Sequence, residues 1–167
     1  MKKILLLLLS GLIVFGIYSY LKPPLSPKGA SNYSFNSKEF TVDYSRPYKK
    51  GRLIFGKKED GALVPYDEYW RTGANFSTDL TVSDDFSFGD RAIKKGSYWL
   101  YTIPSENTWK IFLNSESSSF GYFEPDVENN IAEIIVDSYE LENELEQFTI
   151  SFVEQDNQLF LRLLWDK

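Results

Sequence analysis

The chain has 167 residues, a formal net charge of −6, and neither Cys nor His. These absences exclude disulfides, cysteine-anchored lipids, His-ligated zinc and the Ser-His-Asp and Cys-His classes of hydrolase. We expect no metal site and no cofactor, and any catalysis would have to use carboxylates, Tyr, Lys or Ser. After residue 110 the chain holds 13 acidic and 2 basic side chains, which argues against nucleic acid as a partner.

The N-terminal segment predicts insertion into a membrane. Lys2 and Lys3 precede an apolar run over residues 4–21. Eighteen helical residues span about 27 Å, close to the hydrocarbon thickness of a bilayer. No A-x-A-like cleavage site follows the run, so we expect an uncleaved signal anchor with a cytoplasmic N-terminus. The alternative is a cleaved signal peptide, which would release a secreted or periplasmic protein.

This anchor defines the expected organisation of the chain and makes the membrane its first partner. We expect residues 1–21 to form a single-pass helix in the inner membrane. Residues 22–32 (KPPLSPKGASN) are typical of a stiff Pro-rich spacer. Residues 33–167 should then form one domain in the periplasm.

From Phe40 onward, apolar and polar residues alternate and turn signals recur at short intervals. The pattern predicts strands over residues 40–44, 52–55, 75–82, 86–93, 97–103, 109–113, 131–136, 148–153 and 159–165. Only residues 138–146 (SYELENELE) indicate a short amphipathic helix, with Leu141 and Leu145 four positions apart. Eight or nine short strands without crossover helices favour an all-β fold, an antiparallel and jelly-roll-like β-sandwich.

The densest group of candidate binding residues lies in residues 44–78. Pro47 holds Arg46 extended, and Gly51 and Gly73 mark turns beside Arg52 and Arg71. Three arginines could converge on one carboxylate or phosphate through planar, multidentate hydrogen bonds. We predict a ligand site made of Arg46, Lys50, Arg52, Trp70, Arg71 and Asn75. In the alternative interpretation, the arginines lock the loops of the fold together by pairing with Asp43, Asp67, Glu68 or Asp79.

Several motifs resemble domain-of-unknown-function family 2911, a group of bacterial envelope proteins. They are YSRPYKKGRLIFG, LVPYDEYWRTGAN, KGSYWLYTIP and WKIFLN, and the resemblance extends from about Val42 to Trp165. It implies an envelope location and a β fold, and it implies no reaction and no ligand. The chain departs from the family pattern at Phe76, where members often have an acid, and at its close, where members tend to continue into another strand.

Other residues suggest further ligand classes. Aromatic residues make up 17% of the chain, and they could stack on sugars or fill the core. Glycan cleavage needs a pair of carboxyl groups, for which the candidates are Asp67, Glu68, Asp79, Glu124 and Asp126. The acidic segment 126–130 (DVENN) could offer oxygens to Ca²⁺ but lacks EF-hand spacing.

The sequence therefore favours a binding or envelope-interaction module over an enzyme, and we assign no catalytic residue. Its ligand would be a small anion or a carbohydrate. The alternatives are a glycan hydrolase with paired carboxylates and a purely structural domain.

Overall fold

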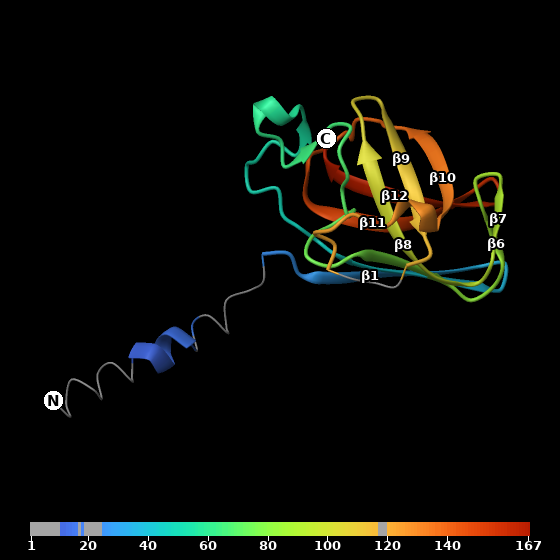
Figure 1. The fold of residues 1–167 in the computed structure, drawn as a ribbon, viewed down its shortest axis with the longest axis horizontal. Helices are drawn as coiled ribbons and strands as arrows, with labels where there is room; N and C mark the ends of the chain where they lie inside the picture. The colour runs from blue at the N-terminus through green and yellow to red at the C-terminus, as the bar shows by residue number, and fades with distance from the viewer. Residues whose placement is uncertain (1–10, 17, 19–24, 117–119) are drawn as a thin grey trace.

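The computed structural model describes residues 11–16, 18, 25–116 and 120–167 (Figure 1). Among these residues, none of the helices is both long enough and apolar enough to cross a membrane. The predicted anchor over residues 1–21 falls largely outside the described residues, so the membrane span stays a prediction.

A six-stranded antiparallel sheet forms the main layer of the domain. Its strands, in spatial order, are β1 (Lys28–Phe35), β2 (Lys38–Ser45), β5 (Thr78–Val82), β8 (Gly96–Pro104), β9 (Thr108–Asn114) and β10 (Asn130–Asp137). Because the spatial order follows the chain order, the sheet is a meander and differs from the jelly-roll order that we expected. The expected strand-rich, antiparallel character is confirmed.

Three two-stranded pairs complete the described part of the chain. They are β3 (Phe55–Gly56) with β4 (Val64–Pro65), β6 (Phe86–Phe88) with β7 (Arg91–Ile93), and β11 (Leu145–Gln155) with β12 (Gln158–Asp166). Two single-turn 3₁₀ helices, η1 (Lys58–Asp60) and η2 (Val127–Asn129), lie in the connections.

Two-residue turns set the register of the first and last hairpins. Asn36 and Ser37 join β1 to β2 with φ values of 49° and 62°, and Asp156 and Asn157 join β11 to β12 with φ values of 52° and 59°. Positive φ at both central residues is the geometry of tight hairpin turns, which Asn and Asp tolerate better than most residues.

The main hydrophobic core lies between the six-stranded sheet and the β11–β12 hairpin, which passes behind β8 and β9 in Figure 1. Val42 and Leu80 of the sheet and Phe148 of β11 are buried in it. Tyr44 joins the two layers, since its ring meets Phe148 edge-on and its hydroxyl accepts a hydrogen bond of 2.9 Å from the N–H of Ile150. Full burial of a large apolar side chain such as Phe148 stabilises the folded state by about 1.5–3 kcal/mol.

Strand β8 is buried on both of its faces. Leu100 belongs to the main core, whereas Trp99 and Tyr101 pack with Phe112 on the opposite face of the sheet. The Tyr101 and Phe112 rings stack with centroids 4.7 Å apart and an interplanar angle of 6°. Partly buried Tyr69 covers this second aromatic cluster from outside the sheet.

The structure differs from the sequence-based expectation at three segments. β1 begins at Lys28, so five residues of the expected spacer belong to the first strand. The strand expected over residues 52–55 is reduced to β3. The helix expected over residues 138–146 is wrong, because residues 138–144 have no helical structure and β11 begins at Leu145. A helix there would place glutamates four positions apart, where like charges repel.

Arg46 fixes the first strand to the rest of the domain. Its N–H donates to the carbonyl of Pro27 at 2.8 Å. Its guanidinium donates to the carbonyl of Phe148 at 3.3 Å and to the hydroxyl of Thr149 at 3.1 Å. The aliphatic part of the side chain lies against Gly29, where a Cβ would stand 2.4 Å from Arg46 Cδ.

This close approach predicts that Gly29→Ala destabilises the domain. The added methyl group must displace Arg46 from its partners in β11, and overpacking of this kind costs about 1–3 kcal/mol. Chemical denaturation followed by circular dichroism measures the loss. The control is Ala30→Ser at the next, exposed position of β1, which should change stability by less than about 0.5 kcal/mol. Equal stability of the two variants would contradict the assignment of Arg46.

Candidate functional site

The six residues predicted to form a ligand site are distributed over four places in the structure. Arg46 joins β1, β2 and β11, as described above. Lys50 and Arg52 lie in the turn after Tyr48, and Trp70 lies in the core. Arg71 and Asn75 lie together on a surface loop.

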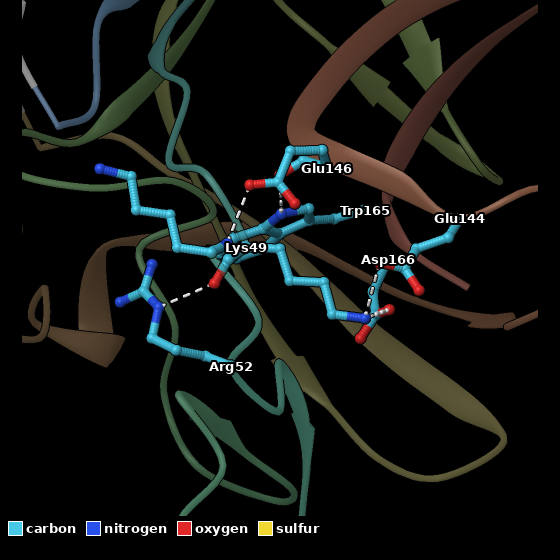
Figure 2. A network of polar contacts seen from close by, with 7 residues as sticks. Lys49, Arg52, Glu144, Glu146, Trp165 and Asp166 are labelled. Carbon is cyan, nitrogen blue, oxygen red and sulfur yellow. Dashed lines mark hydrogen bonds and ion pairs between the residues drawn. The ribbon is translucent and has the colours of Figure 1, made fainter.

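The basic turn over residues 48–52 is bound to the C-terminal hairpin (Figure 2). Lys49 Nζ lies 2.5 Å from Asp166 Oδ1 and 3.1 Å from Glu144 Oε1. The hydrogen bond to Asp166 raises the pKa of Lys49, and Glu144 adds to this effect. Lys49 therefore makes the ion pairs of the YSRPYKKGRLIFG motif, whereas the predicted site included its neighbour Lys50.

The remaining donors of the turn go to backbone and carboxylate oxygens. Arg52 Nε donates to the carbonyl of Lys49 at 3.0 Å, and its terminal nitrogen donates to the carbonyl of Tyr48 at 2.5 Å. The N–H of Lys50 donates to Glu146 Oε1 at 2.9 Å. Figure 2 shows Arg52 and Glu146 on either side of Lys49. The contacts of Lys49, Lys50 and Arg52 thus hold one loop against β11 and β12.

Trp70 is a core residue with 7% of its surface exposed. Its indole stacks on Trp165 at 5.9 Å and 20°, and it packs on Phe148 at 5.0 Å. Its Nε1 donates to the carbonyl of Gly73 at 3.1 Å. Because both the ring and its polar atom are engaged inside the domain, this side chain belongs to the packing of the fold.

Arg71 and Asn75 are the pair of predicted site residues that the structure brings together at the surface. Arg71 donates to the carbonyl of Asn75 at 3.2 Å, and the same carbonyl accepts from the N–H of Gly121 at 3.1 Å. Asn75 has a φ of 64°. A Cβ on Gly121 would lie 3.1 Å from Arg71 Cβ and 3.2 Å from the carbonyl carbon of Phe76. The loop after Trp70 and the loop after β9 are therefore in close contact.

These two loops present four exposed aromatic rings. The exposed fractions are 53% for Phe76, 53% for Phe120, 67% for Tyr122 and 72% for Phe123. Phe76 meets Phe120 edge-on at 5.7 Å, and Tyr122 meets Phe123 edge-on at 5.3 Å. The guanidinium of Arg71 lies 6.0 Å from the Tyr122 ring centroid, within cation–π range. We call this surface the aromatic patch and define it by Arg71, Asn75, Phe76, Phe120, Tyr122 and Phe123.

Contiguous exposed apolar groups on a monomer usually mark an interaction site. Sequence reasoning included Arg71 and Asn75 but missed the phenylalanines and Tyr122. The available signal was the FGYF sequence at residues 120–123, which places three aromatic residues around one glycine.

The patch rests on the second aromatic cluster. The hydroxyl of Tyr69 donates to the carbonyl of Gly121 at 3.2 Å, and burial raises the pKa of Tyr69. Beneath it, Tyr101 and Asn114 both hydrogen-bond the side chain of Asn130, at 2.8 Å and 2.9 Å. A neutral Tyr69 hydroxyl therefore supports the Gly121 turn at every physiological pH.

Most carboxylates considered for catalysis have structural partners. Asp67 accepts a hydrogen bond from Ser105, and Glu68 pairs with Lys58 at 2.8 Å. Asp126 caps η2 by accepting from the N–H of Glu128 at 3.0 Å. In the described part of the chain, no three His, Cys, Asp or Glu side chains gather in a group that could hold a metal ion. These contacts offer no support for the Ca²⁺ hypothesis at residues 126–130.

Asp79 has a different environment. It lies directly opposite Asp43 in the register of β2 and β5, and directly opposite Trp99 in the register of β5 and β8. Like charges that face each other across strands destabilise a sheet. The pair lies on the outer face of the sheet. Asp79 is the third residue after Phe76, which is the last patch residue of the loop after Trp70. Among the described atoms, Trp99 Nε1 is buried and has no hydrogen-bond partner.

The ion pair in Figure 2 predicts that Lys49→Met lowers the melting temperature more than Lys50→Met. The first substitution leaves Asp166 and Glu144 without their shared cation, whereas the Lys50 side chain is exposed. Because the pKa of Lys49 is raised in the folded state, its contribution is fully present below its ordinary value of 10.5 and is lost as the pH rises from there through the raised folded-state pKa. The difference between Lys49→Met and the wild type should therefore shrink in thermal melts at strongly alkaline pH. A constant difference at all pH values would mean that the loss comes from packing alone.

Comparison with known proteins gives a family without a known activity. No curated protein and no solved structure matched the chain. The family described as "Protein of unknown function (DUF2911)" matches residues 26–167. That range includes β1, both surface loops of the aromatic patch and the C-terminal hairpin. The chain therefore belongs to the DUF2911 family.

Proposed function

We propose that this protein is a membrane-tethered interaction module of the cell envelope, with the aromatic patch as its contact surface. The observation that carries the proposal is the group of four exposed aromatic rings on two loops that are bound to each other. Binding, rather than catalysis, agrees with the structural partners of Asp67, Glu68 and Asp126. The scaffold of this module is a β-sandwich whose layers are the six-stranded sheet and the β11–β12 hairpin.

The tether is the apolar segment over residues 4–21, and the domain lies in the periplasm. The start of the domain supports an uncleaved anchor, because cleavage before Ser31 would remove Lys28–Ala30. These residues pair with Ser45, Tyr44 and Asp43 at the start of β1. A mature protein that kept the anchor would keep this pairing.

We predict that the full chain fractionates with membranes and resists extraction by alkaline carbonate, and that its N-terminus is Met1 or Lys2. The physical reason is the apolar length of the segment, which matches the bilayer core. Membrane fractionation and N-terminal sequencing of the isolated protein measure both. A chain that begins near Ser31 and is recovered in the soluble fraction would overturn the tether.

A second candidate function is the binding or cleavage of a glycan beside the patch. The specific observation is the Asp43–Asp79 pair, which lies next to the loop that carries Arg71 and Asn75. Cross-strand Cβ atoms stand about 4.5–5.5 Å apart, a separation from which two carboxyl groups could act on one glycosidic bond. Arg71 could instead bind a small carboxylate or another anion.

We predict that a ligand of this second kind raises the melting temperature of the purified chain in a screen of glycans, carboxylates and phosphorylated metabolites. A hundredfold excess over Kd contributes about 2.7 kcal/mol. Tyr122→Ala should abolish the shift, while Tyr139→Ala, which removes a tyrosine that is 81% exposed elsewhere, should preserve it. Cleavage that is lost in Asp79→Asn would assign a hydrolase. If the panel produces no shift in melting temperature and no cleavage, this candidate is rejected.

A further inference from the structure

We propose that the aromatic patch docks into the lipid–water interface of the membrane that holds the N-terminal segment, and so orients the domain on that membrane. The inference rests on the tether proposed above and names the partner of the patch. Its support comes from the position of the patch, the reach of the tether and the chemistry of the exposed rings.

The patch lies at the end of the sheet where the domain begins. Lys28, the first residue of β1, pairs with Ser45. On the other side of Ser45, a Cβ added to Gly73 would stand 2.9 Å from the Ser45 carbonyl oxygen. Gly73 belongs to the same loop as Asn75, which binds Gly121. The start of β1 and both loops of the patch are thus connected through a short series of direct contacts.

The tether keeps this end of the domain close to the bilayer. The apolar run ends at residue 21, and β1 begins at Lys28. The seven Cα–Cα steps from residue 21 to residue 28 span at most about 25 Å even when fully extended. The start of β1, and the patch connected to it, therefore stay near the membrane surface.

The exposed rings have the chemistry of interfacial anchors. Tyr is favoured at the level of the lipid headgroups, where its ring is buried while its hydroxyl stays in water, and Phe is typical of the face that an interfacial segment buries among the lipids. Phe123 is the most exposed ring of the patch, and Phe76 is among the least exposed. Even Phe76 leaves more than half of its surface uncovered. The hydrogen bond from the Gly121 N–H to the Asn75 carbonyl fixes the two loops to each other. The rings that these loops carry therefore stay at the surface.

Ring geometry and charge distinguish a lipid interface from other partners. The two ring pairs have interplanar angles of 90° and 88°, so neither pair offers a common plane on which a sugar ring would stack. Arg71 is the cation of the patch, while Glu124 follows Phe123 directly and is exposed. Docking should therefore depend on burial of aromatic surface and not on anionic lipids.

The experiment uses the absence of cysteine from the chain. Phe123→Cys in the full-length protein is labelled with an environment-sensitive fluorophore and reconstituted into zwitterionic phosphatidylcholine liposomes. Tyr122→Cys is the second patch label, for the case that the first variant folds poorly. The matched controls are Phe160→Cys and Tyr139→Cys, at residues that are 46% and 81% exposed outside the patch.

We expect the patch labels to show blue-shifted emission and to be quenched several-fold more strongly than the controls by lipids with a spin label near the headgroup. The blue shift should persist at high salt. Patch labels that remain as accessible to an aqueous quencher as the control labels would overturn the inference while the tether stands. A chain absent from the liposomes would overturn the tether and this inference together. A water-exposed patch label that responds to an added glycan would overturn it in favour of the second candidate function.

Discussion

The placement of Trp70 is the constraint on which the surface of this protein depends. Its backbone forms a two-way bridge to Thr102 of β8, with N–H to carbonyl distances of 2.8 Å and 3.0 Å. Its indole is enclosed by Phe148 and Trp165 of the C-terminal hairpin and by Trp109 of β9. With the chain fixed at this point, the next residue must leave the core, and Arg71 is the first side chain to reach the surface. Thr72 then turns back and hydrogen-bonds Thr102 at 3.1 Å, so the loop that carries Asn75 and Phe76 starts from a rigid base.

The basic residues of the family motif have a different role from the aromatic ones. Arg46 and Lys49 join the first third of the chain to β11 and β12. Arg46 donates hydrogen bonds and Lys49 makes ion pairs within the domain, which is the expected behaviour of polar groups at a partly buried junction. In contrast, the aromatic residues of the patch stay exposed although the core could have used their surface. Partly buried polar groups and a contiguous exposed apolar patch are the two departures from an ordinary surface that carry information, and here each indicates a distinct task.

Much of the fold could be predicted from local signals in the sequence. Period-two alternation identified β11 and β12, because each has one face in the core. β8 and β9 also pack aromatic rings on the outer face of the sheet, and their aromatic and β-branched residues identified them as strands. β1 was missed because its sequence is small and polar, and its strand character comes from pairing with β2 rather than from its own residues. The four-residue spacing of Leu141 and Leu145 misled the assignment over residues 138–146, where repulsion between glutamates on neighbouring turns opposes a helix.

The candidate site was harder to predict than the fold, for a geometric reason. Arg46, Arg52 and Arg71 are close in sequence, yet each hydrogen-bonds a different segment. Phe120 and Tyr122 are more than forty residues from Arg71, and tertiary contacts such as the hydrogen bond between Gly121 and Asn75 bring the two loops together. Spacing along a chain carries little information on which loops meet at one end of a sheet. Phe76 illustrates the limit, because its departure from the family pattern marked a lost carboxylate, whereas its position marks an exposed ring.

The long-range contacts of the first strands also impose an order on biogenesis. Tyr44, Arg46 and Lys49 have partners that lie 106, 102 and 117 residues later in the sequence. Such non-local contacts form slowly, and none of them can form before the C-terminal hairpin has emerged. The hydrophobic faces of β2 and β5 therefore stay uncovered during synthesis until β11 and β12 have emerged. Completion of the core waits for the final hairpin.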